Sequence, residues 1–75
     1  MTKDDLYFYI QTKKPLEFKF NDKTYRLYYD TDSYGKDIIF FGQIFEGKPF
    51  DSFGDLMNKA KVENYFFKDL LEDIN

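Results

Sequence analysis

The chain has 75 residues, a length at which we expect one small domain spanning residues 1–75. It contains no cysteine and no histidine, which removes disulfides, thiolate metal sites, cysteine nucleophiles and imidazole bases together. Its net charge of −3 at pH 7 argues against nucleic-acid binding, because phosphate is contacted by clustered cations. We therefore expect a protein that is not an enzyme and that takes no cofactor, metal or nucleic acid.

The first apolar run of the chain, at residues 6–10, is far too short for the core of a signal peptide or for a membrane span. It follows a start that contains Asp4 and Asp5, whereas a signal peptide starts with positive charge. We therefore expect no membrane partner and a cytoplasmic location.

An N-terminal helix is predicted over the first residues. Thr2 and Asp5 have the spacing of a capping box, with aspartate in place of the preferred glutamate. The apolar residues that follow share one helical stripe: Leu6, Tyr9 and Ile10. Pro15 ends the element. Residues 6–10 also suit a short strand, because tyrosine, phenylalanine and isoleucine favour strands, but we favour the helix.

A β-hairpin follows the helix. Residues 16–20 alternate apolar and charged side chains, as in a strand with one buried face. The turn pair Asn21-Asp22 tolerates positive φ and leads into a second strand at residues 24–29. A two-residue loop here places Phe18 opposite Tyr25, and the acid Glu17 opposite the base Arg26. The pattern therefore predicts the register of this hairpin.

The third predicted strand, residues 38–45, does not alternate. Its apolar side chains lie on both faces, which is typical of strands covered on both sides. In a three-stranded meander it would lie at the edge, where a long apolar run invites pairing with another chain. The polar connection at residues 30–37 leaves the register open. We interpret Ile39 and Phe41 as facing outward, rather than Ile38 and Phe40.

Two short helices are predicted to close the chain after a turn at residues 46–49. Ser52 starts the first helix, whose apolar stripe is Phe53, Leu56, Met57 and Ala60. After a break at residues 62–64, the second helix repeats the stripe with Phe67, Leu70, Leu71 and Ile74. Neither helix would be stable alone, so both must pack on the sheet, with Leu70 and Leu71 buried. The pattern predicts an α+β fold in the order α-β-β-β-α-α, a three-stranded antiparallel meander with one N-terminal and two C-terminal helices.

The connection between the second and third strands contains a partial calcium-loop motif. Asp30, Asp32 and Gly35 match the opening of an EF-hand loop. The match then fails, because Tyr34 and Phe41 occupy positions where the loop needs oxygen ligands. We expect no tight Ca²⁺ binding and a glycine that adopts positive φ in a β-connection.

The outer half of the third strand is the predicted partner-binding surface. Unless the N-terminal helix covers it, an apolar patch is exposed that consists of Tyr28, Ile39, Phe41 and Phe45. Such a patch beside a free strand edge favours a homodimer or strand addition by a protein partner. The sequence thus predicts a small non-catalytic cytoplasmic protein-interaction module, with self-association through the third strand as one form of it.

Two other functions compete with this prediction. An acidic inhibitor could mimic nucleic acid, with carboxylates in place of phosphates: Glu63, Asp69, Glu72 and Asp73. Alternatively, Tyr28 and Phe41 could stack bases beside Arg26 and Lys19, but the acidic balance of the chain disfavours this. Binding by a nucleic-acid mimic weakens steeply as salt rises, whereas apolar docking does not. The salt dependence of binding therefore separates the mimic from the interaction module.

Overall fold

A computed structural model describes residues 1–74 of the chain, so the last residue of the expected domain lies outside the described part. The elements are α1 (Lys3–Gln11), β1 (Leu16–Phe20), β2 (Lys23–Thr31), β3 (Asp37–Gln43), β4 (Lys48–Phe50), α2 (Phe53–Lys59), β5 (Lys61–Val62), β6 (Tyr65–Phe66) and the 3₁₀ helix η1 (Phe67–Asp73). Strands β1 to β4 form one antiparallel sheet in chain order, and β5 pairs with β6. The α+β class and the antiparallel meander are confirmed.

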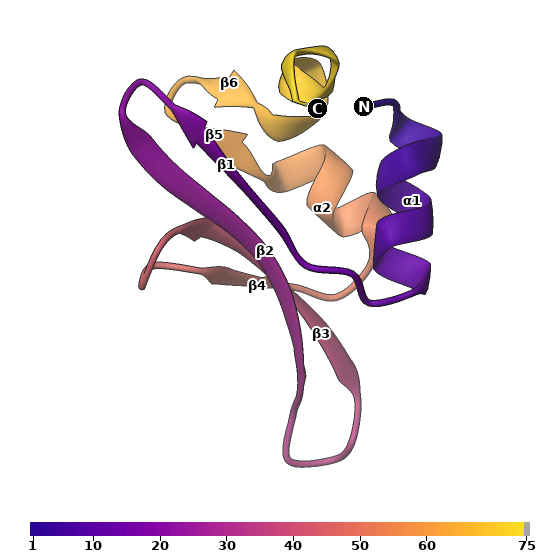
Figure 1. Ribbon diagram of the computed structural model, residues 1–75. Helices are drawn as coiled ribbons and strands as arrows, with labels where there is room; N and C mark the ends of the chain where they lie inside the picture. The colour runs from indigo at the N-terminus through magenta and orange to yellow at the C-terminus, as the bar shows by residue number, and fades with distance from the viewer. Residues whose placement is uncertain (75) are drawn as a thin grey trace.

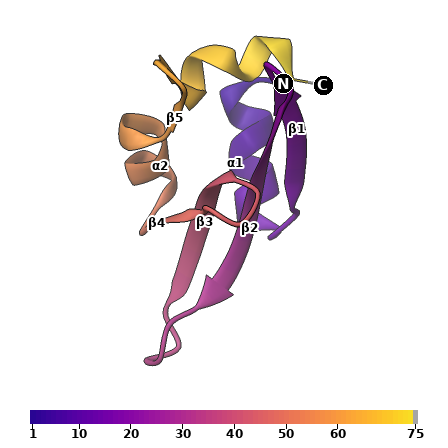
Figure 2. The ribbon, with the colours of Figure 1, turned by 90° about the vertical axis from the view of Figure 1, so that its left-hand side faces the viewer.

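The helices all lie on one side of the four-stranded sheet (Figure 1). Seen from the left-hand side of Figure 1, β2 and β3 are in front and α1 is behind them (Figure 2). The sheet therefore has an inner face, covered by α1, α2 and η1, and an outer face that none of these elements covers. The β2–β3 hairpin extends beyond the helices in both views (Figures 1 and 2).

Helix α1 starts as predicted. The backbone N–H of Asp5 donates to Thr2 Oγ1 at 3.1 Å, and the backbone N–H of Thr2 donates to Asp5 Oδ2 at 3.0 Å. This reciprocal capping box satisfies two of the free N–H groups at the helix start. Leu6 is fully buried and Ile10 packs against the core, so the helix and not the competing strand is confirmed.

The β1–β2 hairpin has the predicted register. Phe18 lies opposite Tyr25 and Glu17 opposite Arg26. The loop is the two-residue turn Asn21-Asp22, and both residues have positive φ, 49° and 65°. Two successive positive-φ residues match the twist of a tight hairpin, which explains why this short polar pair joins the strands.

The predicted orientation of the third strand is wrong. Ile39 and Phe41 are buried, with 7% and 2% of their surface exposed. The reason is the β2–β3 register, which places Phe41 opposite Leu27 and Ile39 opposite Tyr29, on the inner face. Phe40, on the other parity, belongs to the outer face.

The third strand is also not an edge strand along its centre. Strand β4 pairs with β3 at Ile39, Phe40 and Phe41, so these residues offer no free edge to a partner. Residues 48 and 49 belong to the predicted turn at residues 46–49, but the structure places them in β4. Pro49 is tolerated here since β4 is itself the outermost strand. Phe50 anchors β4 by packing into the core.

The C-terminal part follows the prediction for α2 and departs from it afterwards. Ser52 caps α2, with the backbone N–H of Asp55 donating to its Oγ at 3.1 Å. The predicted break is the turn of the β5–β6 hairpin, where Glu63 has φ +56°. The final helix is 3₁₀ in form, and its Leu70 and Leu71 are buried as predicted.

The core is built from stacked rings. Phe67 of η1 is fully buried and lies 4.2 Å from Phe41 and 5.8 Å from Phe18, measured between ring centroids. Phe18 in turn stacks on Tyr25 at 5.7 Å. The inner face of the sheet and η1 thus share one aromatic layer, which fixes η1 over the sheet.

Candidate functional site

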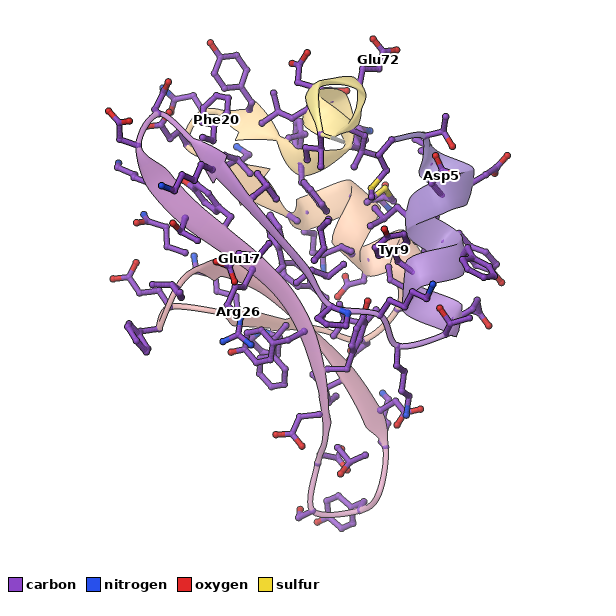
Figure 3. All side chains as sticks on the ribbon, in the orientation of Figure 1. Asp5, Tyr9, Glu17, Phe20, Arg26 and Glu72 are labelled. Carbon is purple, nitrogen blue, oxygen red and sulfur yellow. The ribbon has the colours of Figure 1, made fainter. Side chains whose placement is uncertain are left out.

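The outer face is the candidate site. It is defined by Glu17, Lys19, Arg26, Tyr28, Ile38 and Phe40, which share one parity across β1, β2 and β3. None of these six residues is fully buried. Figure 3 shows Glu17 and Arg26 on neighbouring strands on the same side of the sheet. The face therefore carries both signs of charge beside apolar side chains.

An aromatic pair forms the centre of the outer face. Tyr28 and Phe40 are direct cross-strand partners, and their rings stack at 5.2 Å with an angle of 9° between planes. The guanidinium carbon of Arg26 lies 4.9 Å from the centre of the Tyr28 ring. This geometry is a cation–π contact, which holds the arginine side chain over the Tyr28 ring. The three side chains form a rigid, half-exposed platform.

The β3–β4 turn lies against this platform. A side chain at Gly47 would begin 2.6 Å from the Tyr28 hydroxyl oxygen, and one at Gly42 would begin 2.7 Å from the Glu46 carbonyl oxygen. Gly42 therefore needs glycine, because the clash there is with the backbone, whereas a side chain at Gly47 would have to displace the Tyr28 side chain. The same turn carries Ile44 and Phe45, whose side chains are both exposed.

Phe45 has an unusual conformation. Its φ is +70°, and 97% of its surface is exposed. It occupies the third position of a turn closed by the Glu46 N–H donating to the Gln43 carbonyl at 2.8 Å, a position that glycine or asparagine normally fills. A left-handed conformation costs a side-chain-bearing residue roughly 1–2 kcal/mol. No burial compensates this cost, so the fold itself does not explain a phenylalanine here.

The structure separates the four residues predicted to bind a partner. Tyr28 belongs to the outer face and Phe45 is exposed on the β3–β4 turn, whereas Ile39 and Phe41 lie in the core. Sequence reasoning missed the role of Phe40, because the strand parity was assigned the other way. The sequence predicts Arg26 as the partner of Glu17 and as a possible neighbour of stacked bases, but its contact with Tyr28 was missed. Its place two residues before Tyr28, on the same strand and the same face, was a usable signal.

The partial calcium motif is used by the backbone of the β2–β3 loop. Asp32 Oδ1 accepts hydrogen bonds from the backbone N–H groups of Tyr34 at 2.8 Å and Lys36 at 2.9 Å. Gly35 has φ +81°, as expected for the turn. Within residues 1–74, no group of three or more acidic side chains is arranged to hold a metal ion. Weak or absent Ca²⁺ binding stays a prediction.

The acidic side chains do not form one phosphate-like row. Glu63 accepts a hydrogen bond from Asn21 Nδ2 at 2.7 Å and lies 3.5 Å from Lys23 Nζ. The exposed acids of η1 belong to another element, and Glu72 points away from the sheet (Figure 3). The charge of Glu63 is thus already balanced by Lys23 of the same chain. The other three carboxylates proposed as phosphate mimics, Asp69, Glu72 and Asp73, all belong to η1.

Three sites show how local contacts shift protonation. Hydrogen bonds from the backbone and side chain of Thr2 lower the pKa of Asp5. A hydrogen bond from Lys59, followed by one from the Asp51 backbone, lowers the pKa of Asp55. Burial raises the pKa of Tyr29 to about 12. The Tyr29 hydroxyl donates to the Lys14 carbonyl at 2.7 Å, so all three groups are explained by capping or packing.

None of the helices in the described part of the chain combines the length and the apolar character needed to cross a bilayer. Comparison of the chain with protein-family models, with curated proteins and with solved structures gives no match in any of the three. The functional conclusion therefore rests on the geometry of this molecule.

Proposed function

We propose that the protein is a small non-catalytic cytoplasmic interaction module, and that its outer face binds a protein partner. The observation that carries the proposal is Phe45, which is held fully exposed in a conformation that costs free energy. The same turn carries Gly47, which lies against Tyr28 of the stacked pair, on the face of the sheet that no helix covers. Exposed aromatic side chains and arginine are the residue types that dominate protein interfaces.

The partner that we propose is a second copy of the chain. The outer face carries Glu17 beside Lys19 and Arg26, so a two-fold arrangement can place the acid of one copy against a base of the other. The sheets of the two copies would then pack face to face, as in a β-sandwich. The β3 edge, which is paired with β4 along its centre, takes no part in this arrangement.

Sedimentation equilibrium over a range of protein concentrations tests this proposal. We expect the wild type to dimerise and Phe40→Lys to remain a folded monomer, because the lysine would place a charge at the centre of the interface. Phe8→Lys is the matched control, since Phe8 is also exposed but lies on α1. A wild type that stays monomeric at the highest concentration reached would contradict the homodimer.

The same experiment at several salt concentrations separates apolar docking from association through charge pairs. Dimerisation through the aromatic platform should change little as salt screens exposed charges. An association that weakens steeply with salt would instead show that pairs between Glu17 of one copy and a base of the other carry it.

A further inference from the structure

A cleft of about 380 Å³ opens on the inner side of the sheet, away from the outer face. It lies where the ends of the β1–β2 and β3–β4 hairpins meet the junction of α2 and β5. Its size falls within the range of about 300–1,000 Å³ that small-molecule sites occupy. Four lysines line it: Lys23, Lys48, Lys59 and Lys61.

The charge of this cleft is opposite to that of the whole chain. Its four lysines face two lining carboxylates, Glu46 and Glu63, which gives 4 − 2 = +2 in a protein of net charge −3. Glu63 pairs with Lys23 at 3.5 Å, and Lys59 pairs at 2.9 Å with an aspartate of α2. Within residues 1–74, Lys48 and Lys61 take part in no ion pair. A concave site that gathers like charges concentrates anions.

The wall of the cleft also contains a tyrosine. Tyr25 lines it and has only 4% of its surface exposed. Its hydroxyl makes no hydrogen bond to any residue that the structure describes. No fully buried side-chain polar atom in this part of the chain lacks a partner, so the Tyr25 hydroxyl must reach the surface. The cleft is the surface that Tyr25 lines.

From these observations we infer that the cleft is a binding site for a phosphate-bearing small molecule. Lysine ammonium groups bind phosphate as point charges, and the Tyr25 O–H can donate to a phosphate oxygen. The rings of Phe41 and Phe50 line the same cleft and offer apolar contact for the organic part of a phosphate ester. This site does not depend on the proposed dimer, because it uses the opposite face of the sheet and different side chains.

Isothermal titration calorimetry at fixed ionic strength tests the inference with pyrophosphate, adenosine monophosphate and adenosine as probes. We expect the wild type to bind at least one of the two phosphate compounds and not adenosine. Tighter binding of adenosine monophosphate than of pyrophosphate identifies a phosphate ester as the ligand class. The reverse order identifies an inorganic phosphate anion.

Two variants assign the binding to the cleft. Lys48→Gln with Lys61→Gln should weaken binding by about tenfold or more, since hydrogen bonds to charged groups are the strong ones. Tyr25→Phe removes only the hydroxyl and should weaken binding about three- to tenfold in a protein that still folds. The matched control is Lys3→Gln with Lys36→Gln, which removes the same charge outside the cleft and should leave affinity within about twofold.

The inference is overturned if neither phosphate compound binds the wild type at millimolar concentration. It is also overturned if the control pair loses as much affinity as the cleft pair, because the effect would then be one of overall charge. Circular dichroism of each variant shows that the compared proteins are folded.

Discussion

On the inner face of the sheet, aromatic rings stack on one another and on Phe67 of η1, whereas on the outer face Tyr28 and Phe40 stack only on each other and under Arg26. The two faces use the same residue types. Two successive residues of β3 show this, since Phe40 lies on the outer face and Phe41 on the inner face. What differs is the covering layer: the helices lie over the inner face and not over the outer face (Figure 1), so the outer rings stay partly exposed. Whether an aromatic residue of this sheet lies in the core or at the surface therefore depends on which face of the sheet its side chain is on.

The inner layer should be the most sensitive to substitution. Phe67→Ala removes a fully buried ring from the centre of the stack, and we expect a loss of about 3–5 kcal/mol in the free energy of unfolding. A domain of this size has roughly 4–11 kcal/mol in total, so the variant should be close to unfolded. Urea denaturation followed by circular dichroism measures the loss.

The neighbouring Phe66→Ala is the control for that variant. Phe66 is partly exposed, and the ammonium groups of Lys61 and Lys68 lie over its ring. We expect it to cost less than about 1 kcal/mol. Equal losses for the two phenylalanines would show that η1 does not seal the core as described.

The outer face should be sensitive at its glycines. In Gly42→Ala the new methyl group would begin 2.7 Å from the Glu46 carbonyl oxygen, so the backbone of the β3–β4 turn must move. We expect a loss of about 1–3 kcal/mol, read from the urea midpoint. Gly35→Ser is a weaker test of backbone strain alone, because nothing lies within 4 Å of the added atom at Gly35. A Gly42→Ala protein as stable as the wild type would mean that the turn does not fold onto the sheet.

Phe45→Asn should act in the opposite direction. Asparagine accepts the left-handed conformation more readily than phenylalanine, so the variant should gain roughly 0.5–1 kcal/mol in stability. It should also weaken self-association, which would separate the stability of the fold from its proposed function. Tyr34→Asn serves as the control, because Tyr34 is equally exposed but has no positive φ. A stability loss at Phe45 would show that its ring contributes to the fold.

The last prediction for the two faces concerns the rim of the inner face and appears only at alkaline pH. Burial raises the folded-state pKa of Tyr29 to about 12, above the value of about 10 expected in the unfolded chain. The neutral phenol is favoured by folding, so its contribution is fully present below pH 10 and is lost as the pH rises from 10 towards 12. Spectrophotometric titration should show one late tyrosine that is absent in Tyr29→Phe. A wild-type titration without a late component would show that Tyr29 is not buried as the structure has it.

The sequence predicted some elements because their patterns allow only one arrangement. In β1 the alternation of apolar and charged residues, together with the turn Asn21-Asp22, leaves one register that matches every pair. The capping box at Thr2 similarly marks where α1 begins. Such local signals are sufficient because each is satisfied by neighbouring residues alone.

Other elements could not be predicted because their placement depends on distant contacts. Strand β3 is apolar on both parities, so only the tertiary register with β2 decides that Phe41 is buried and Phe40 is not. Strand β4 has three residues including Pro49, too short to be distinguished from a turn without its partner. Of the candidate site, Phe45 was identified as a strand residue, but its importance comes from a turn conformation that no local pattern announces.

The most direct test of the account compares lysine pairs on the two parities of β3. Ile38→Lys with Phe40→Lys changes the outer face, and Ile39→Lys with Phe41→Lys changes the core. We predict that circular dichroism shows a folded protein with a cooperative urea transition for the outer pair and an unfolded chain for the inner pair, because two unpaired charges cannot be buried. An outer pair that unfolds the protein, or an inner pair that leaves it folded, would contradict the division of the sheet into a core face and a free face.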